Sequence, residues 1–297
     1  MEVRSRSGFR LPTQRSFNIV PLSKLELALR VGLFVMLGGL GLLSFPALTQ
    51  AVGAGLLVTS ALSSFAAGAV ANAVTVRAFE RGRLSDFGLG WSPASGQQFL
   101  LGLGLGAAAA SAILGLSLLT HAASIDKAPA VAPHPAIALV LVILALLFGA
   151  AGEEMLFHGY AFQLLVRTAG AFATILPFGV IFGIAHLSNQ NATVLGAVNT
   201  AAWGILLGFA YWKSEALWLP IGLHFGWNLA LPLFGAKLSG FTMGLTGYAL
   251  HWSVGNLWSG GDYGPEGSLS TTFAVIVLFW AVSRAGATRN PAESEGS

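Results

Sequence analysis

Eight stretches of about 20 mainly apolar residues dominate the sequence, and each could cross the hydrocarbon core of a bilayer as a helix. Lipid offers no hydrogen-bond partners, so a spanning backbone must pair its N–H and C=O groups internally, as helices do. We place the spans at 27–45, 51–76, 98–120, 136–160, 172–190, 194–212, 216–235 and 269–284. The sequence therefore predicts an all-α, polytopic membrane helical bundle with about eight transmembrane helices.

The composition agrees with a lipid environment. Charged residues make up only 9% of the chain, against about 25% in soluble domains. There is no cysteine, which excludes disulfides, thiolate zinc ligands and a cysteine nucleophile. The net charge is +3, but the basic residues are spread along loops rather than clustered. Membrane topology explains them better than nucleic acid, so we expect the bilayer and no nucleic acid as a partner.

The basic residues also predict the orientation. With eight spans, both termini lie on the same side of the membrane. All but two of the 15 lysines and arginines fall on that side, and the exceptions are Lys127 and Lys237. Because basic residues concentrate in cytoplasmic loops, we expect cytoplasmic termini. We expect the location to be the cell (inner) membrane.

Four segments follow along the chain. A basic cytoplasmic N-terminal arm (1–25) precedes the first three spans with their loops (26–134). Spans 4 to 7 form a core (135–235), and an outer loop, span 8 and a short C-terminal tail complete the chain (236–297). Span 3 carries small residues four apart, at Gly102, Gly106 and Ala110, a spacing typical of close helix packing.

Few ionisable residues lie at membrane depth. A charged side chain near the centre of a membrane helix costs roughly 2.5–3.5 kcal/mol on insertion scales. Such groups therefore indicate chemistry, ion or proton handling, or a buried polar network. The candidates are Glu153, Glu154, His158, His186 and His224.

Helical spacing separates the two adjacent glutamates. Neighbouring residues on a helix point about 100° apart, so Glu153 and Glu154 cannot face the same point. Residues four apart share a face, which places Glu154 beside His158. We expect Glu154 and His158 to form a supporting pair and Glu153 to face a cavity.

The other spans add partners for Glu153. His224 and Asn228 share a face of span 7, and Phe182 lies beside His186 on span 5. Glu153 could act as a general base toward water, with His186 orienting that water. His224 and Asn228 could then donate hydrogen bonds to an oxyanion. The sequence predicts a hydrolytic site between spans 4, 5 and 7.

Three motifs in this region resemble those of one membrane protease family. Residues 153–159, Glu-Glu-Met-Leu-Phe-His-Gly, are similar to the EExxxR motif of the CPBP family, which includes the CAAX prenyl protease 2-like and Abi proteins. Residues 182–186 match its FxxxH motif, and residues 224–228 match HxxxN. Order and spacing agree over about residues 135–235.

The resemblance implies an intramembrane endopeptidase, and some members of the family trim prenylated C-terminal tripeptides. By position, Glu153 and His186 would activate water, while His224 and Asn228 would form the oxyanion hole. The expected partner is a peptide or protein substrate at the membrane, and no cofactor is predicted. The alternative is zinc, for which Glu153, His186 and His224 are the candidate ligands.

One residue departs from the family pattern, because His158 stands where the motif has arginine. Histidine titrates near neutrality and offers fewer donors than arginine. The Glu154–His158 pair is then a neutral couple, a source of pH-dependent activity, or the mark of a lost peptidase. The rival functions are a non-catalytic membrane immunity or scaffold protein and an ion-coupled carrier. Substrate, prenylation and oligomeric state stay open.

Depth sets a further expectation. A helix that begins at residue 135 places Glu153 about 27 Å along it, too near the cytoplasmic face to meet His186. We therefore expect span 4 to be one long tilted helix over about residues 138–166, with Glu153 at mid-depth.

Overall fold

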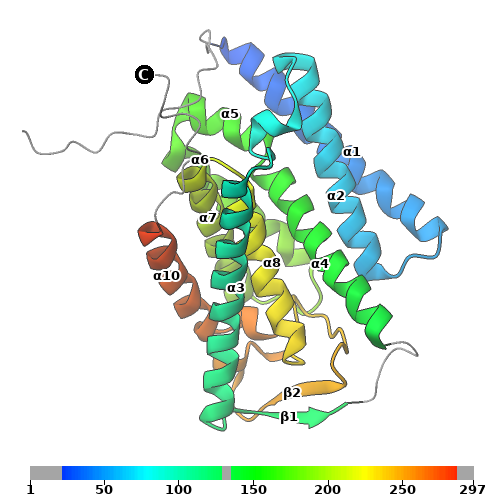
Figure 1. Ribbon diagram of the computed structural model, residues 1–297, viewed down its shortest axis with the longest axis vertical. Coiled ribbons are helices and arrows are strands. Elements are labelled where there is room, and N and C mark those ends of the chain that lie inside the picture. Colours follow the sequence, from blue (N-terminus) through cyan, green and yellow to red (C-terminus); the bar gives the residue numbers. More distant parts are fainter. Residues whose placement is uncertain (1–21, 129–134, 286–297) are drawn as a thin grey trace, which may run out of the picture.

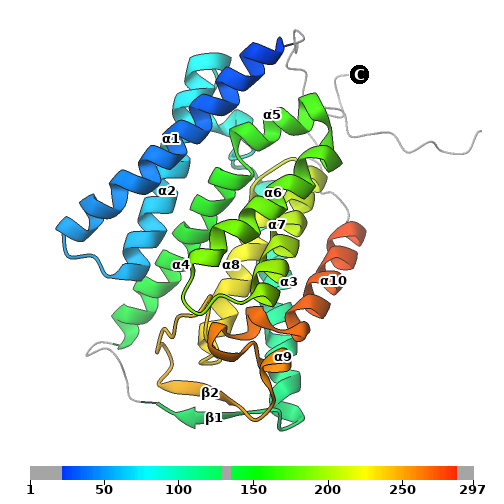
Figure 2. The ribbon, with the colours of Figure 1, turned by 180° about the vertical axis from the view of Figure 1, so that it is seen from behind.

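The computed structural model describes residues 22–128 and 135–285, so most of the N-terminal arm and the C-terminal tail lie outside the described residues. In Figures 1 and 2, α4, α7 and α8 lie in the middle of a helical bundle, with α1 and α2 on one side and α10 on the other. The helices are α1 (Lys24–Ala51), α2 (Leu56–Thr75), α3 (Pro93–Leu119), α4 (Pro135–Phe157), α5 (Tyr160–Ala169), α6 (Ala171–Ala185), α7 (Val194–Ser214), α8 (Trp218–Leu233), α9 (Asn256–Ser259) and α10 (Leu269–Arg284).

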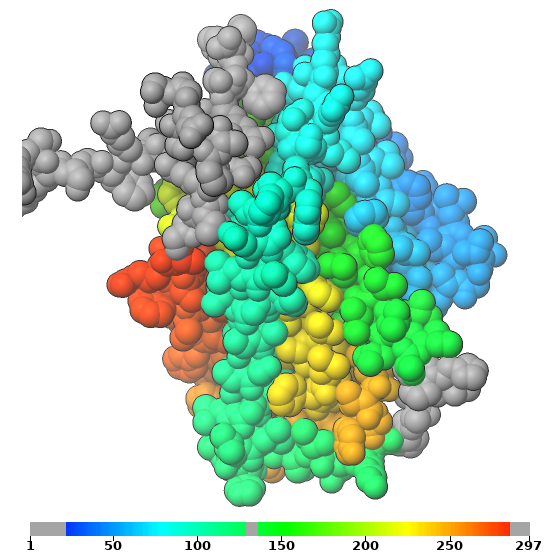
Figure 3. All heavy atoms as spheres, in the orientation of Figure 1, coloured from blue at the N-terminus to red at the C-terminus, as the bar shows by residue number. Residues whose placement is uncertain are grey.

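The membrane character of the bundle is confirmed, whereas the count of eight spans stays a prediction. Within the described residues, six helical stretches are long and apolar enough to cross a bilayer. Helices α8 and α10 have only 16 residues each. Most of α8 is buried among its neighbours. Figure 3 shows only a narrow strip of α8, in yellow, between α3 and α4 on this face.

Close packing of α3 against α8 holds α8 in place. A Cβ atom added at Gly102 or Gly106 of α3 would overlap the carbonyl oxygens of Leu219 and Leu223 on α8. The contact is reciprocal, because glycines on α8 approach the backbone of α3 just as closely. Small residues permit this approach, and dispersion contacts between backbones then stabilise the pair. The small-residue stripe seen in the sequence therefore positions the helix that carries His224.

The long helix expected over residues 138–166 is broken. One apolar span does run from 136 to 169, as an extended span 4 requires. However, α4 ends at Phe157, and Gly159 has a non-helical backbone conformation (φ −77°, ψ −147°) before α5 begins. In Figures 1 and 2, α5 lies across the end of the bundle at which α1 begins. Glu153 therefore lies four residues before a helix end inside the bundle.

One buried side chain, Asn72, bonds to the backbone on both sides of this break. An interrupted helix leaves backbone groups without partners, which is costly where water is excluded. Asn72 of α2 donates from Nδ2 to the carbonyl oxygen of Met155 at 2.8 Å. Its Oδ1 accepts the N–H of Tyr160 at 2.8 Å. A Cβ atom at Gly159 would overlap both the carbonyl oxygen of Met155 and the Asn72 amide, so the bend requires glycine.

The outer loop is more ordered than the sequence suggested. Strands β1 (Ala123–Lys127) and β2 (Tyr248–Trp252) pair antiparallel, with Ala123 opposite Trp252. After β2, the chain forms α9 and short 3₁₀ turns and then enters α10. The sheet lies at the opposite end of the bundle from the start of α1 and the end of α10 (Figures 1 and 2). The loop packs back against the helices and contributes to the cavity described next.

Candidate functional site

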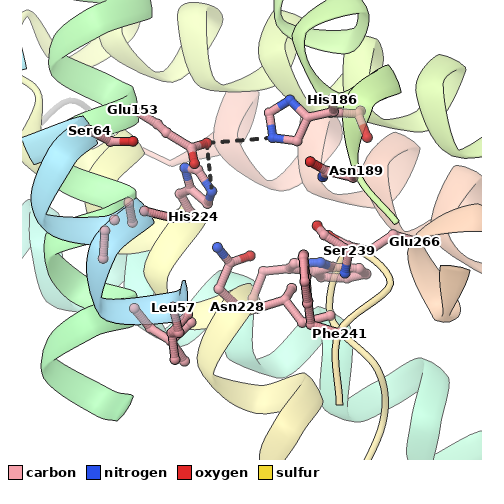
Figure 4. A pocket seen from close by; sticks show the side chains of 18 of the residues that line it. Leu57, Ser64, Glu153, His186, Asn189, His224, Asn228, Ser239, Phe241 and Glu266 are labelled. Carbon is pink, nitrogen blue, oxygen red and sulfur yellow. Dashed lines mark hydrogen bonds and ion pairs between the residues drawn. The ribbon is translucent and has the colours of Figure 1, made fainter. Parts of the chain in front are cut away.

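A cavity of about 200 Å³ lies among α2, α4, α6, α7, α8 and the outer loop (Figure 4). It contains the four side chains that the sequence predicted to share a hydrolytic site. Those residues are Glu153, His186, His224 and Asn228. They come from α4, the end of α6 and α8, which correspond to the predicted spans 4, 5 and 7.

Glu153 faces the cavity and lies between two imidazoles. Its Oε2 atom is 3.6 Å from Nε2 of His186 and 3.8 Å from Nε2 of His224 (Figure 4). This oxygen is buried and makes no hydrogen bond to the described residues. The side chain is 30% exposed, and that exposure is toward the cavity. A carboxylate oxygen near two ring nitrogens is suited to accept a proton from water.

His186 has a defined tautomer because of where α6 ends. Its Nδ1 atom is 2.8 Å from the carbonyl oxygen of Phe182, and since a carbonyl only accepts, Nδ1–H donates. In the neutral ring, Nε2 is then a lone-pair acceptor facing Glu153. The Phe182 ring lies beside the imidazole, with centroids 4.5 Å apart. The expected aromatic wall next to His186 is therefore present.

Glu154 points away from the cavity and holds two histidines. Its Oε2 is 2.7 Å from Nδ1 of His158, as the helical spacing predicted. Its Oε1 is 2.9 Å from Nδ1 of His224, a contact that the sequence did not predict. The Glu154 side chain is fully buried. An ionised carboxylate accepts from both rings, so each imidazole donates from Nδ1 and directs Nε2 elsewhere.

His158, in the position of the motif arginine, makes a single polar side-chain contact. Its Nε2 is buried without a hydrogen-bond partner in the described residues. The ring lies edge-on to Phe162, with centroids 4.9 Å apart and planes at 88°. Gly208 of α7 lies against the same ring. His158 therefore contacts Glu154 but does not line the cavity.

The outer loop forms the wall of the cavity opposite Glu153, and sequence analysis missed it (Figure 4). The Glu266 carboxylate accepts from the backbone N–H and the hydroxyl of Ser239, at 2.5 Å and 3.0 Å. Its backbone carbonyl accepts from Asn199 of α7 at 2.8 Å. Burial raises the pKa of Glu266 above its ordinary value. No spacing pattern links these residues, because loop contacts place them.

Glu153, His186 and His224 also supply donor types that suit zinc. Each histidine has Nδ1 engaged by an oxygen acceptor and Nε2 directed to the cavity, as metal-binding histidines do. Among residues 22–128 and 135–285, however, no group of three His, Asp or Glu side chains is arranged to hold a metal ion. The donor chemistry fits zinc, whereas the present placement does not.

Comparison with known proteins supports the resemblance seen in the motifs. A family model described as type II CAAX prenyl endopeptidase Rce1-like matches residues 135–230, roughly a third of the chain. No curated protein matches the chain. The family predicted from three motifs is thus confirmed over the segment that carries them. Together with the apolar helices, the match makes this an integral, multi-pass membrane protein.

Proposed function

We propose that the chain is an endopeptidase for a membrane-associated protein or peptide, because residues 135–230 match the type II CAAX prenyl endopeptidase Rce1-like family model. The observation that supports this most strongly is the position of Glu153. Its Oε2 lies within 4 Å of Nε2 on both His186 and His224, at the wall of one cavity. We assign the catalytic core to 135–235.

In this proposal, Glu153 and His186 activate water. A water molecule beside both residues donates one proton to Oε2 of Glu153 and the other to the lone pair on Nε2 of His186. Its oxygen lone pair is then free to attack the peptide carbonyl carbon. Glu153 accepts a proton as the new C–O bond forms, which is general-base catalysis. The supporting geometry is the 3.6 Å separation of the two acceptors.

His224 and Asn228 stabilise the oxyanion that this attack generates. Asn228 donates from its amide and His224 from Nε2–H. Donation from Nε2 requires a second proton on the His224 ring, because Nδ1–H already donates to Glu154. Glu154 compensates that charge, as the aspartate behind a catalytic histidine does in serine proteases. We assign Glu154 and His158 to this positioning role.

Collapse of the intermediate completes the reaction. The C–N bond breaks, and Glu153 returns its proton to the leaving amine. The products are a new carboxyl terminus and a new amino terminus, so water is the only co-reactant. Phe182 limits the water around His186 by covering one face of its ring.

A zinc-dependent mechanism is the alternative for the same peptidase activity. The donor types of Glu153, His186 and His224 support it. A bound zinc would lower the pKa of coordinated water and polarise the substrate carbonyl. Two measurements separate the mechanisms: the metal content of the purified protein, and its peptide cleavage before and after chelation. We expect no stoichiometric zinc and unchanged cleavage. Loss of cleavage on chelation, with recovery on adding zinc, would establish the metal mechanism.

The proposed orientation has both termini in the cytoplasm. Basic residues gather at the ends of α5, α7 and α10, which lie at the same end of the bundle as the start of α1 (Figures 1 and 2). Lys127 ends β1 at the other end. This asymmetry supports the proposed orientation by the positive-inside rule, and in that orientation the outer loop would lie on the far side of the membrane.

The direct test is cleavage of a quenched-fluorescence peptide panel, prenylated and unprenylated, by the wild type and Glu153→Gln. Glutamine preserves the size of the side chain and removes the base. Both proteins should first show the same unfolding temperature in detergent. We expect cleavage by the wild type alone. Equal cleavage by both proteins, or by neither, would overturn the proposal and favour a non-catalytic membrane protein.

A further inference from the structure

The cavity wall opposite Glu153 contains a second carboxyl group, that of Glu266, which hydrogen bonds hold in place. Glu266 has one oxygen occupied by two donors from Ser239, while Asn199 fixes its backbone carbonyl. Asn199 also bonds the carbonyl oxygen of Ser268 and the hydroxyl of Thr272, which ties the segment to α10. Figure 4 shows Glu266 and Ser239 together on this side of the cavity. Glu266 is therefore held at the cavity wall by contacts on both sides.

The charges of the cavity favour some substrate ends over others. Among the cavity-lining residues that the structure describes, Glu153 and Glu266 are acidic and none is lysine or arginine. Lys237, beside the lining residue Leu238, pairs with Asp262 at 2.9 Å. His224 donates from Nδ1 to Glu154, and in our proposal its Nε2–H is used by the oxyanion. A free carboxylate that entered this cavity would meet two acidic groups and no lysine or arginine, and the two lining histidines are those that our proposal assigns to water and to the oxyanion.

A C-terminal carboxylate lies close enough to a nearby scissile bond to meet the acidic groups of the cavity. An extended chain advances about 3.3–3.6 Å per residue, so a terminal tripeptide places its carboxylate roughly 10 Å from the cleaved bond. A substrate cleaved at Glu153 would therefore carry that carboxylate along the cavity walls. An internal segment would instead present peptide N–H groups, which are donors suited to a carboxylate acceptor.

Building on the proposed peptidase activity, we propose that Glu266, oriented by Ser239, determines substrate specificity at this site. Its carboxylate binds an N–H donor that flanks the scissile bond, and it excludes a free C-terminal carboxylate. The substrate then enters as an internal segment rather than as a free C-terminal tripeptide. The donor is a backbone amide or a lysine side chain, and the peptides below distinguish the two.

The test is a binding measurement on the full-length protein in detergent. The first pair of fluorescent peptides has one lysine-containing sequence and ends in a free acid or in an amide. The second pair is the same except that norleucine replaces the lysine. We expect the wild type to bind the amide about tenfold more tightly than the acid, equivalent to about 1.4 kcal/mol. In Glu266→Gln, which keeps an acceptor for Ser239, the ratio should fall toward one. A lysine donor would show as weaker binding of the norleucine peptide by the wild type alone.

Two further variants make the result specific. Ser239→Ala removes one hydrogen bond to Glu266 without altering charge, and we expect an intermediate ratio. Asp126→Asn removes an acidic group from β1 whose side chain is 65% exposed, and the ratio should match that of the wild type. An unchanged ratio in Glu266→Gln, tighter wild-type binding of the acid, or binding of neither peptide would overturn the proposal. Binding needs no turnover, so failure of the subsite is distinguishable from failure of the peptidase.

Discussion

The two walls of the cavity are built by different kinds of structure. Helices α4, α6 and α8 supply Glu153, His186 and His224 from positions held by close helix packing. The opposite wall comes from the outer loop, where Ser239 and Glu266 are placed by contacts to α7. The helical wall holds the groups that our proposal assigns to chemistry, and the loop wall holds the group that it assigns to specificity.

This difference shows how a membrane protein can separate two tasks. The helical wall cannot change without disturbing backbone contacts such as those between α3 and α8. The loop wall can change more freely, because loops tolerate substitution and insertion better than packed elements do. Substitutions on the helical wall should therefore abolish turnover, whereas those on the loop wall should alter which peptides bind.

A large effect, second only to loss of the general base Glu153, should come from the oxyanion donors of the helical wall. Asn228→Asp replaces a donor by an acceptor of equal size, and His224→Gln removes the charged donor. Loss of one oxyanion donor typically lowers kcat by about 10²–10³. We expect that loss in each variant, with little change in KM, from steady-state kinetics on the best peptide. Asn189→Asp, on the same cavity, is the matched control and should retain most of the activity.

A smaller effect should appear in the pH dependence of selectivity on the loop wall. Burial raises the pKa of Glu266, so as the pH falls this carboxyl gains its proton earlier than an exposed glutamate would. The amide-over-acid binding ratio should therefore be highest above that raised pKa and decline as the pH falls through it.

The groups facing Glu266 define the control for this profile. Tyr263 has its pKa raised by burial to about 12, so it stays neutral throughout. His186 also faces Glu266 and gains charge as the pH falls. Glu266→Gln leaves both in place, so its ratio should be low and nearly flat with pH. If the binding ratio of Glu266→Gln declined as much as that of the wild type when the pH falls, the effect would belong to His186.

The smallest effect should follow restoration of the motif arginine. His158 contacts the cavity only through Glu154, and the Glu154–His224 hydrogen bond does not require it. We expect His158→Arg to retain kcat within about tenfold, with some loss of stability because the site beside Gly208 and Phe162 is tightly packed. A gain of 100-fold or more would instead show that His158 impairs the natural enzyme.

The helical wall was predictable because helical spacing carries the information. Residues four apart share a face, so the sequence alone pairs Glu154 with His158 and His224 with Asn228. Apolar windows identify most spans because a spanning helix needs about 20 apolar residues. The all-α bundle follows from these local patterns. The grouping of Glu153, His186, His224 and Asn228 at one cavity was expected from the scarcity of ionisable residues at membrane depth and from the motif resemblance.

Long-range contacts were not predictable from the sequence. The bend after Phe157 depends on Asn72, more than 80 residues earlier, which bonds both sides of the break. The contact of Glu154 with His224 joins residues 70 apart. Glu266 reaches the cavity through Ser239 and Asn199, neither of which belongs to a motif. These features depend on which elements meet in space, and no periodicity records that.

The most direct test compares the two adjacent glutamates, since the account gives them opposite roles. Glu153→Gln and Glu154→Gln should be assayed together for peptide cleavage and for unfolding temperature. Glu153→Gln should lose about 10²–10⁴ in kcat with an unchanged unfolding temperature, because it removes a general base at a cavity wall. Glu154→Gln should lose activity and about 3 kcal/mol of stability, because it breaks a buried charge-paired network. Full cleavage by a stably folded Glu153→Gln protein would contradict the central claim.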